Sequence, residues 1–239
     1  MIEKIENESQ LDGWEKRDIF TVRILALLDS YGCKYGFANY YRQVIDGRIC
    51  AIMSRLDNDY TLSLAEGADI QELVRFFCIS GYSSILAPEE FEFGAKYTCG
   101  DVMLCDKKLE YDLQGGIVDE YPKLMDLYNF VDYSDTDFKA WYVDISHRVR
   151  HNTAKAYTLN YGGNIVSSGI LSAIIDGYSV LTAVQTDDEY RGKGFGSALV
   201  KFICNDVGSR VYIMREENLN ENFYLKCGFE NCSRWRMYR

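Results

Sequence analysis

The segment from Ala154 to Thr186 constrains the fold most, because it combines alternating apolar residues with two short turn signals. Gly162-Gly163 and Asp176-Gly177 divide it into three strand-like stretches. Such pairs favour two-residue hairpins, since both central positions take positive φ. The segment therefore predicts an antiparallel meander of three strands.

Helices are predicted on both sides of this meander. Apolar residues recur at helical spacing over 124–131 and 138–149, and Ser134 or Thr136 is the expected cap of the second helix. After the meander the pattern predicts a helix over 197–206, a strand over 210–214, a short helix over 220–226 and a last strand near Trp235. The expected fold class is α/β (α+β), with a mixed, mostly antiparallel sheet flanked by helices.

The N-terminal half predicts the same succession of elements. They are a helix over 14–28, strands over 37–44, 48–56 and 60–64, a helix over 69–78 and a strand over 83–87. At a shift of 126 positions, residues 73–78 lie over 199–204 with four of the six identical. We infer a duplication, with one domain over 1–106 and a second over 107–239; the loops compared next make the first the degenerate copy and the second the candidate catalytic domain.

The loop from Arg191 to Gly196 carries the strongest chemical signal. Its three glycines let the backbone approach a ligand, and the following helix adds unpaired N–H groups and a positive dipole end. The spacing fits neither a Walker A loop nor a dinucleotide-binding fingerprint. At the same shift, the first half has Ala65–Ile70, with one glycine and two carboxylates. The sequence therefore predicts one diphosphate site, in the second half.

Residues 184–199 resemble the acyl-CoA-binding motif of the GNAT superfamily of N-acyltransferases, through Arg191, Gly194 and Gly196. A second family signature, an aromatic pair before x-x-x-Gly-Phe, is similar to residues 223–229. The resemblance covers about 107–239, and it implies a GNAT-like fold.

The resemblance also implies roles for individual residues. Tyr224 would protonate the departing thiolate, which suits a phenol that stays neutral at pH 7. The family's asparagine position holds Glu217 here, so Asn218 is the candidate for that role. The implied cofactor-binding residues are Val184, Gln185, Thr186, Arg191, Gly192, Lys193, Gly194, Phe195, Gly196, Ser197 and Asn218.

The implied activity is an N-acetyltransferase that moves an acetyl group from acetyl-CoA to a primary amine by direct attack on the thioester. The acidic composition favours a cationic small molecule or a peptide amine as acceptor. The general base is left open among Tyr212, Glu216 and Glu217. Two alternatives stay open: a non-catalytic acyl-CoA sensor and an interaction module.

Composition argues against other partners. The net charge of −10 disfavours nucleic acid and anionic membranes, and the sequence has no apolar run long enough to span a bilayer. The first residues do not resemble a secretion signal, so the expected location is the cytoplasm. The sequence leaves open whether the chain forms a homodimer.

Metal and thiol chemistry are also not expected. Asp144, His147 and His151 share a helix face, but this face lies opposite the apolar one and fits solvent exposure better than zinc binding. The eight cysteines include no Cys-x-x-Cys pair and are expected to be buried, reduced thiols. Cys227 is expected to be a packing residue. The alternating tail around Trp235 and Met237 predicts an edge strand.

Overall fold

The computed structural model describes residues 1–131, 133, 137–208 and 210–239 and forms two compact units. The first unit contains Met1–Val102, Met214–Glu217 and Cys232–Arg239, and the second contains Met103–Ile213 and Asn218–Asn231. The compact units are therefore not two halves of the sequence, because two short C-terminal segments belong to the first unit. The proposed domains 1–106 and 107–239 describe the repeat along the chain.

The first unit is a sheet with one helix on each face. Its elements are β1 (Ile2–Lys4), α1 (Ile19–Tyr31), β2 (Ala38–Ile45), β3 (Arg48–Leu56), β4 (Asp59–Leu64), α2 (Ile70–Ser80), β5 (Ser84–Pro88), most of β6 (Tyr97–Cys105) and most of β12 (Glu230–Tyr238). The strand order is β1-β2-β3-β4-β5-β12-β6. β4 and β5 run parallel, whereas β1 to β4 form antiparallel pairs and β12 is antiparallel to β5.

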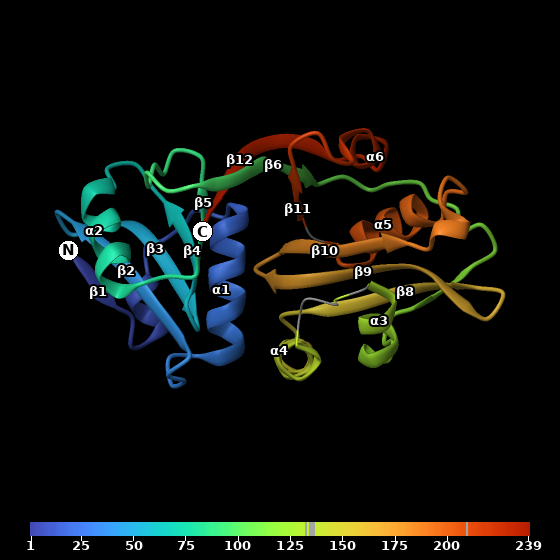
Figure 1. Cartoon of the computed structure of the whole chain (residues 1–239), viewed down its shortest axis with the longest axis horizontal. Coiled ribbons are helices and arrows are strands. Elements are labelled where there is room, and N and C mark those ends of the chain that lie inside the picture. The colour runs from blue at the N-terminus through green and yellow to red at the C-terminus, as the bar shows by residue number, and fades with distance from the viewer. Residues whose placement is uncertain (132, 134–136, 209) are drawn as a thin grey trace. The chain divides into compact units, whose positions relative to one another are not determined.

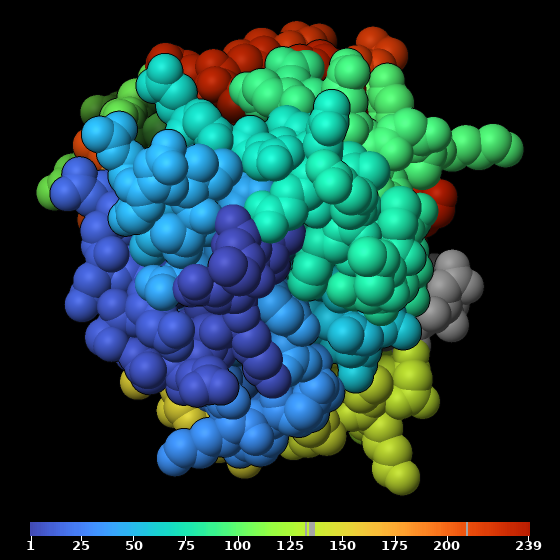
Figure 2. Space-filling view, turned by 90° about the vertical axis from the view of Figure 1, so that its left-hand side faces the viewer, coloured from blue at the N-terminus to red at the C-terminus, as the bar shows by residue number. Residues whose placement is uncertain are grey.

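Neighbouring residues of β3 show how the two helices are placed. Ile52 packs in a cluster with Ile24 of α1, and Met53 packs in another with Phe77 of α2. Because successive strand residues point to opposite faces, α1 and α2 cover opposite sides of this sheet, as Figure 1 shows. In Figure 2 the dark-blue N-terminal segment lies beside the teal α2, where the Ile2 amide donates to Glu72.

The second unit contains the predicted meander. Its elements are β7 (Ile117–Asp119), α3 (Leu124–Val131), α4 (Phe138–Arg150), β8 (Lys155–Tyr161), β9 (Asn164–Ile175), β10 (Tyr178–Thr186), α5 (Phe195–Asp206), the first part of β11 (Arg210–Glu216) and α6 (Glu221–Lys226). The order β11-β10-β9-β8-β7 is antiparallel except for the parallel pair β10–β11. The residues of both predicted turns have positive φ, which confirms the two hairpins.

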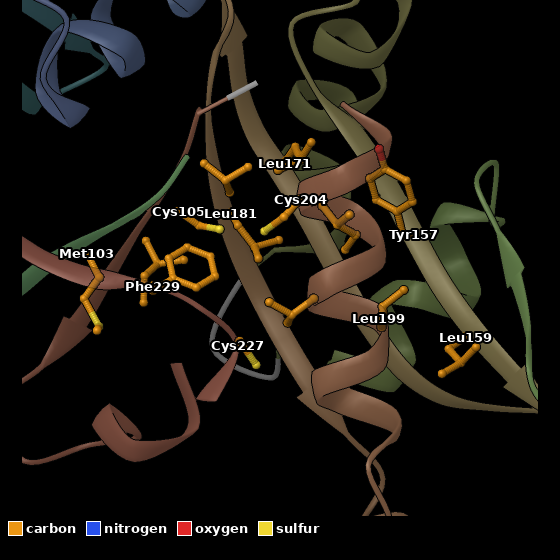
Figure 3. Packing of buried hydrophobic residues seen from close by; sticks show 14 of the residues in the cluster. Met103, Cys105, Tyr157, Leu159, Leu171, Leu181, Leu199, Cys204, Cys227 and Phe229 are labelled. Atoms are coloured by element: carbon orange, nitrogen blue, oxygen red, sulfur yellow. The ribbon is translucent and has the colours of Figure 1, made fainter. Parts of the chain in front are cut away.

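The core of the second unit forms on both faces of its sheet. Leu171 of β9 packs with Leu199 of α5, in the cluster drawn in Figure 3. Ile170, the preceding residue, packs with Leu127 of α3 and Ile145 of α4. α5 therefore covers one face while α3 and α4 cover the other.

Both units share one succession: three antiparallel strands, a helix, and a strand parallel to the third. The helices α2 and α5 occupy equivalent places in it. The mixed, mostly antiparallel α/β fold and the internal duplication agree with the sequence analysis.

Some expected element boundaries were wrong. α1 begins at Ile19 instead of residue 14, because the Asp18 carboxylate caps it by accepting from the Thr21 amide. α4 is capped by Asp137, and the expected caps Ser134 and Thr136 lie outside the described residues. The tail is not an edge strand, because β12 lies between β5 and β6. β1, β6 and β7 were not predicted.

Candidate active site

A cavity of about 740 Å³ lies in the second unit, where the end of β10, the start of α5 and the short helix α6 meet. Its volume is within the usual range for ligand pockets, about 300–1,000 Å³. The lining residues are Val184, Gln185, Thr186, Tyr190, Arg191, Gly192, Gly194, Phe195, Gly196, Ser197, Lys201, Asn220, Phe223, Tyr224 and Lys226. The structure thus gathers the two sequence motifs around one space.

A β-bulge shapes the β10 wall of this cavity. The pairing with β9 shifts between Thr182 and Gln185, and Ala183 takes a φ of +51° within the irregularity. The Ser168 hydroxyl donates to the Ala183 carbonyl over 3.1 Å and holds the bulge against β9. On the other side, the parallel pairing with β11 covers only Tyr178–Val180. The last residues of β10 therefore present an edge to which an extended ligand could add.

The start of α5 provides backbone donors. Gly194 precedes the helix with φ +90° and ψ −10°, a left-handed conformation that favours glycine, and the structure gives no side-chain cap. The first backbone bond of this turn runs from the Ala198 amide to the Gly194 carbonyl, over 2.9 Å. The Lys193 amide donates to the Tyr190 carbonyl at 3.3 Å, whereas the N–H groups from Gly194 to Ser197 have no backbone acceptor among the described residues. These four amides are therefore available to an anion, which the helix dipole also favours.

Gly196 allows close packing inside this turn. A Cβ built at that position would overlap the Thr186 hydroxyl. Thr186 itself is held by β9, where its hydroxyl lies 3.2 Å from that of Ser167. Glycine at position 196 therefore lets the end of β10 and the first turn of α5 come together.

The charged residues of the loop differ in their contacts. The Arg191 guanidinium lies 2.8 Å from Asp188 and donates to the Thr186 carbonyl at 3.3 Å, so its side chain stays beside the end of β10. The Lys193 amine lies 4.9 Å from the centre of the Tyr190 ring. Lys193 is not among the cavity-lining residues, and its assignment as a cofactor ligand stays a prediction.

Tyr224 lines the cavity from α6, where its amide donates to the Asn220 carbonyl at 3.2 Å. Burial raises the pKa of the Tyr224 phenol to about 12, and the nearby Cys227 adds to the shift. The phenol is therefore protonated throughout the neutral range and can donate a proton into the cavity.

The three candidates for the general base have different surroundings. Glu217 binds the Arg234 guanidinium, and this hydrogen bond lowers the pKa of its carboxyl. Tyr212 is buried, with its ring stacked on that of Tyr178 at 6.1 Å. Glu216 is exposed. A lowered pKa makes Glu217 a weaker base, and the general base stays open.

Sequence reasoning missed several lining residues. They are Tyr190, Lys201, Asn220, Phe223 and Lys226. Asn220 lines the cavity whereas Asn218, the predicted candidate, does not. Lys201 follows Ser197 by four residues and so shares its helix face, a spacing that could have identified it.

The equivalent place in the first unit is filled by side chains. The Asp69 carboxylate caps α2 by accepting from the Glu72 amide at 2.9 Å. The buried Gln43 accepts from the Asp69 amide at 2.9 Å and donates to the Glu72 carboxylate at 2.8 Å. The carboxylates of Asp69 and Glu72 and the amide of Gln43 therefore occupy the first turn of α2. In the first turn of α5, no such side chains cover the backbone N–H groups.

The other chemical groups singled out in the sequence have structural roles. Asp144 pairs with Arg148 at 2.8 Å. Burial raises the pKa of the Cys227 thiol to about 12, which suits a packing residue. Within the described residues, no three potential ligands gather as a metal site and no disulfide forms. The expected burial of the cysteines is wrong for Cys78 and Cys232, which lie on exposed positions of α2 and β12. No helix in the described part of the chain has the length and hydropathy of a membrane span.

Residues 152–231 match the family model of an acetyltransferase (GNAT) domain. The match covers about a third of the chain and lies, apart from Met214–Glu217, within the second unit, where it includes the end of β10, the loop before α5, and α6. None of the curated proteins compared matches the sequence.

Solved structures extend the likeness to the whole chain. A GCN5-related N-acetyltransferase from Kribbella flavida is 14% identical, with a TM-score of 0.59 over 92% of this chain and 93% of its own. A tandem GNAT protein from the clavulanic acid biosynthesis pathway is 11% identical, with a TM-score of 0.57 over 100% and 98%. A region of a fungal multi-domain β-N-acetylglucosaminidase, described as a glucosamine N-acetyltransferase, is 14% identical, with a TM-score of 0.57 over 99% of this chain. This chain spans only 37% of that fungal protein. At these identities the likeness shows the fold alone, which is GNAT-like in both units.

Proposed function

We propose that the second unit catalyses transfer of an acetyl group from acetyl-CoA to a primary amine. The observation that carries the proposal is the single cavity in which the open edge of β10, the uncapped start of α5 and the Tyr224 side chain meet. The extended backbone of β10 matches the amide-bearing pantetheine arm, and the backbone N–H groups of α5 match the pyrophosphate. The neutral phenol of Tyr224 matches the leaving thiolate.

Acetyl-CoA supplies an acetyl group activated as a thioester. The end of β10 would pair with the pantetheine arm, and the amides from Gly194 to Ser197 would hold the pyrophosphate, since that of Lys193 is bound to the Tyr190 carbonyl. Backbone N–H groups near Val184–Thr186 would stabilise the charge that develops on the carbonyl oxygen. These contacts would place the carbonyl carbon for attack by the amine.

The reaction forms a C–N bond and breaks the C–S bond. The amine nitrogen attacks as the neutral base, and its surplus proton leaves through a base or bound water. Tyr224 would donate its proton to the departing thiolate, because its phenol stays neutral at pH 7 and the residue lines the cavity. The phenolate then regains a proton from solvent.

The deciding test measures thiol release and follows Tyr224→Phe. The assay would use a panel of small cationic amines, amino sugars and peptides with a free amino terminus. Removing one general acid should lower kcat by about 100-fold, with the Kd for acetyl-CoA unchanged within about twofold. Tight binding of CoA without turnover of any amine would instead identify a sensor, and absence of CoA binding would favour an interaction module.

A further inference from the structure

The cavity contains more positive charge than a pyrophosphate site at α5 requires. Arg191, Lys201 and Lys226 line it, and among its described lining residues there is no carboxylate. This is unusual for a chain with a net charge of −10. The excess of cations predicts that the ligand carries more anionic charge than the loop alone neutralises.

Lys201 and Lys226 have no protein partner. Neither side chain forms an ion pair or hydrogen bond with any residue that the structure describes. Other lysines of the same unit are paired, since Lys107 lies 2.7 Å from Glu230 and Lys155 lies 2.8 Å from Asp206. The two cavity lysines are therefore free to bind a ligand.

The positions of the two lysines point to one common subsite. Lys201 lies one turn beyond Ser197, about 6 Å farther along the axis of α5. Lys226 ends α6. A Cβ built at Gly196 would lie 3.7 Å from the Phe223 ring, so α6 packs beside the first turn of α5, and both lysines line the same cavity.

We propose that Lys201 and Lys226 bind the 3′-phosphate of acetyl-CoA and make the site selective for CoA over its 3′-dephospho form. The inference rests on the proposed function, because it assumes that acetyl-CoA occupies the cavity. A phosphomonoester carries a charge close to −2 at pH 7 and offers three acceptor oxygens, so two ammonium groups match it. The amides of α5 remain available for the pyrophosphate.

The test compares acetyl-CoA with 3′-dephospho-acetyl-CoA by calorimetry on the full chain. The native protein should bind acetyl-CoA at least about tenfold more tightly, and Lys201→Met/Lys226→Met should remove this preference by weakening only acetyl-CoA. Lys201→Arg/Lys226→Arg should keep it. Lys139→Met, at an exposed position of α4 that does not line the cavity, removes one charge and should change neither affinity.

The possible outcomes separate this inference from the proposed function. Equal affinity of the native protein for both ligands would overturn the phosphate subsite while leaving acetyl transfer intact. Equal weakening of both ligands in the methionine variant would also overturn it, because the lysines would then act on a part that both ligands share. Failure of the native protein to bind either ligand would overturn both proposals.

Discussion

The surroundings of the Tyr224 phenol determine its acidity. The side chain packs against the core cluster that contains Phe229, with the two rings 5.7 Å apart. In this environment the charged phenolate is disfavoured, which is why its pKa rises to about 12. A proton donor is therefore maintained well above neutral pH without any charged partner.

This burial predicts the pH dependence of catalysis. The raised pKa keeps Tyr224 protonated below about pH 12, so kcat should rise as the acceptor amine loses its proton and then stay level to at least pH 10.5. Steady-state kcat between pH 6 and 10.5 would show this, with Tyr224→Phe measured in parallel. A decline with a midpoint near pH 9 that the phenylalanine variant lacks would contradict the raised pKa.

At the scale of elements, the contrast between α5 and α2 explains which unit carries the site. α5 begins after Gly194 with no side chain capping its first turn, whereas α2 begins after Asp69, whose carboxylate caps that turn. The two helices share most of a six-residue segment, so the difference lies in the residues that precede each helix. The loop before α5 contains glycines and cations, whereas the loop before α2 contains carboxylates. This difference determines that only the start of α5 can accept an anion.

The first turn of α5 should be sensitive to a single methyl group. Gly196→Ala would push its Cβ against the Thr186 hydroxyl, which is fixed by β9, and so separate the walls of the cavity. We expect acetyl-CoA affinity to fall by about tenfold or more and the free energy of unfolding to drop by about 1–3 kcal/mol. Calorimetry and urea denaturation would measure these two effects.

Ser197→Ala is the matched control for this change. Its hydroxyl donates only to the Gly194 carbonyl, at 2.9 Å, and its removal leaves the backbone amides in place. Acetyl-CoA affinity should then stay within about threefold of the native value. Equal losses in both variants would contradict the steric explanation.

The sequence predicts elements well where their signals are local. Gly162-Gly163, Asp176-Gly177 and the loop beginning at Arg191 each determine their own backbone, and the structure contains the meander, the turns and the helix that they predict. β6 was not predicted because the contact that accounts for it involves residues far away in the sequence. Gly100 in this strand lies against the backbone of Arg215, more than a hundred positions away, and no pattern around it shows that contact.

The residues of the site also fall into those that the sequence predicted and those that it missed. The resemblance to the two GNAT motifs implied the residues predicted there, and most of them line one cavity. Lys201 and Lys226 were missed because a lysine on a helix is ordinary until its neighbours are known. Their significance depends on which residues pair and which do not, and pairing is a property of the folded chain.

For the whole molecule, the filled start of α2 predicts one coenzyme per chain. Gln43 accepts from the Asp69 amide and the Asp69 carboxylate accepts from the Glu72 amide, so a phosphate there would have to displace both side chains and would also face the Glu72 carboxylate. Calorimetric titration with acetyl-CoA should therefore give a stoichiometry near one. A value near two would contradict this prediction, as would residual binding by Gly194→Glu, which places a carboxylate in the α5 loop.

The placement of β12 has a consequence for how the protein is made. Trp235 to Tyr238 pair with β5, so the sheet of the first unit includes a strand from the far end of the chain. During translation the first hundred residues leave the ribosome long before this strand is synthesised. The edge of β5 that pairs with β12 therefore stays unpaired until the end of synthesis. A gene cut at the midpoint would yield neither unit complete, although the sequence reads as two successive copies.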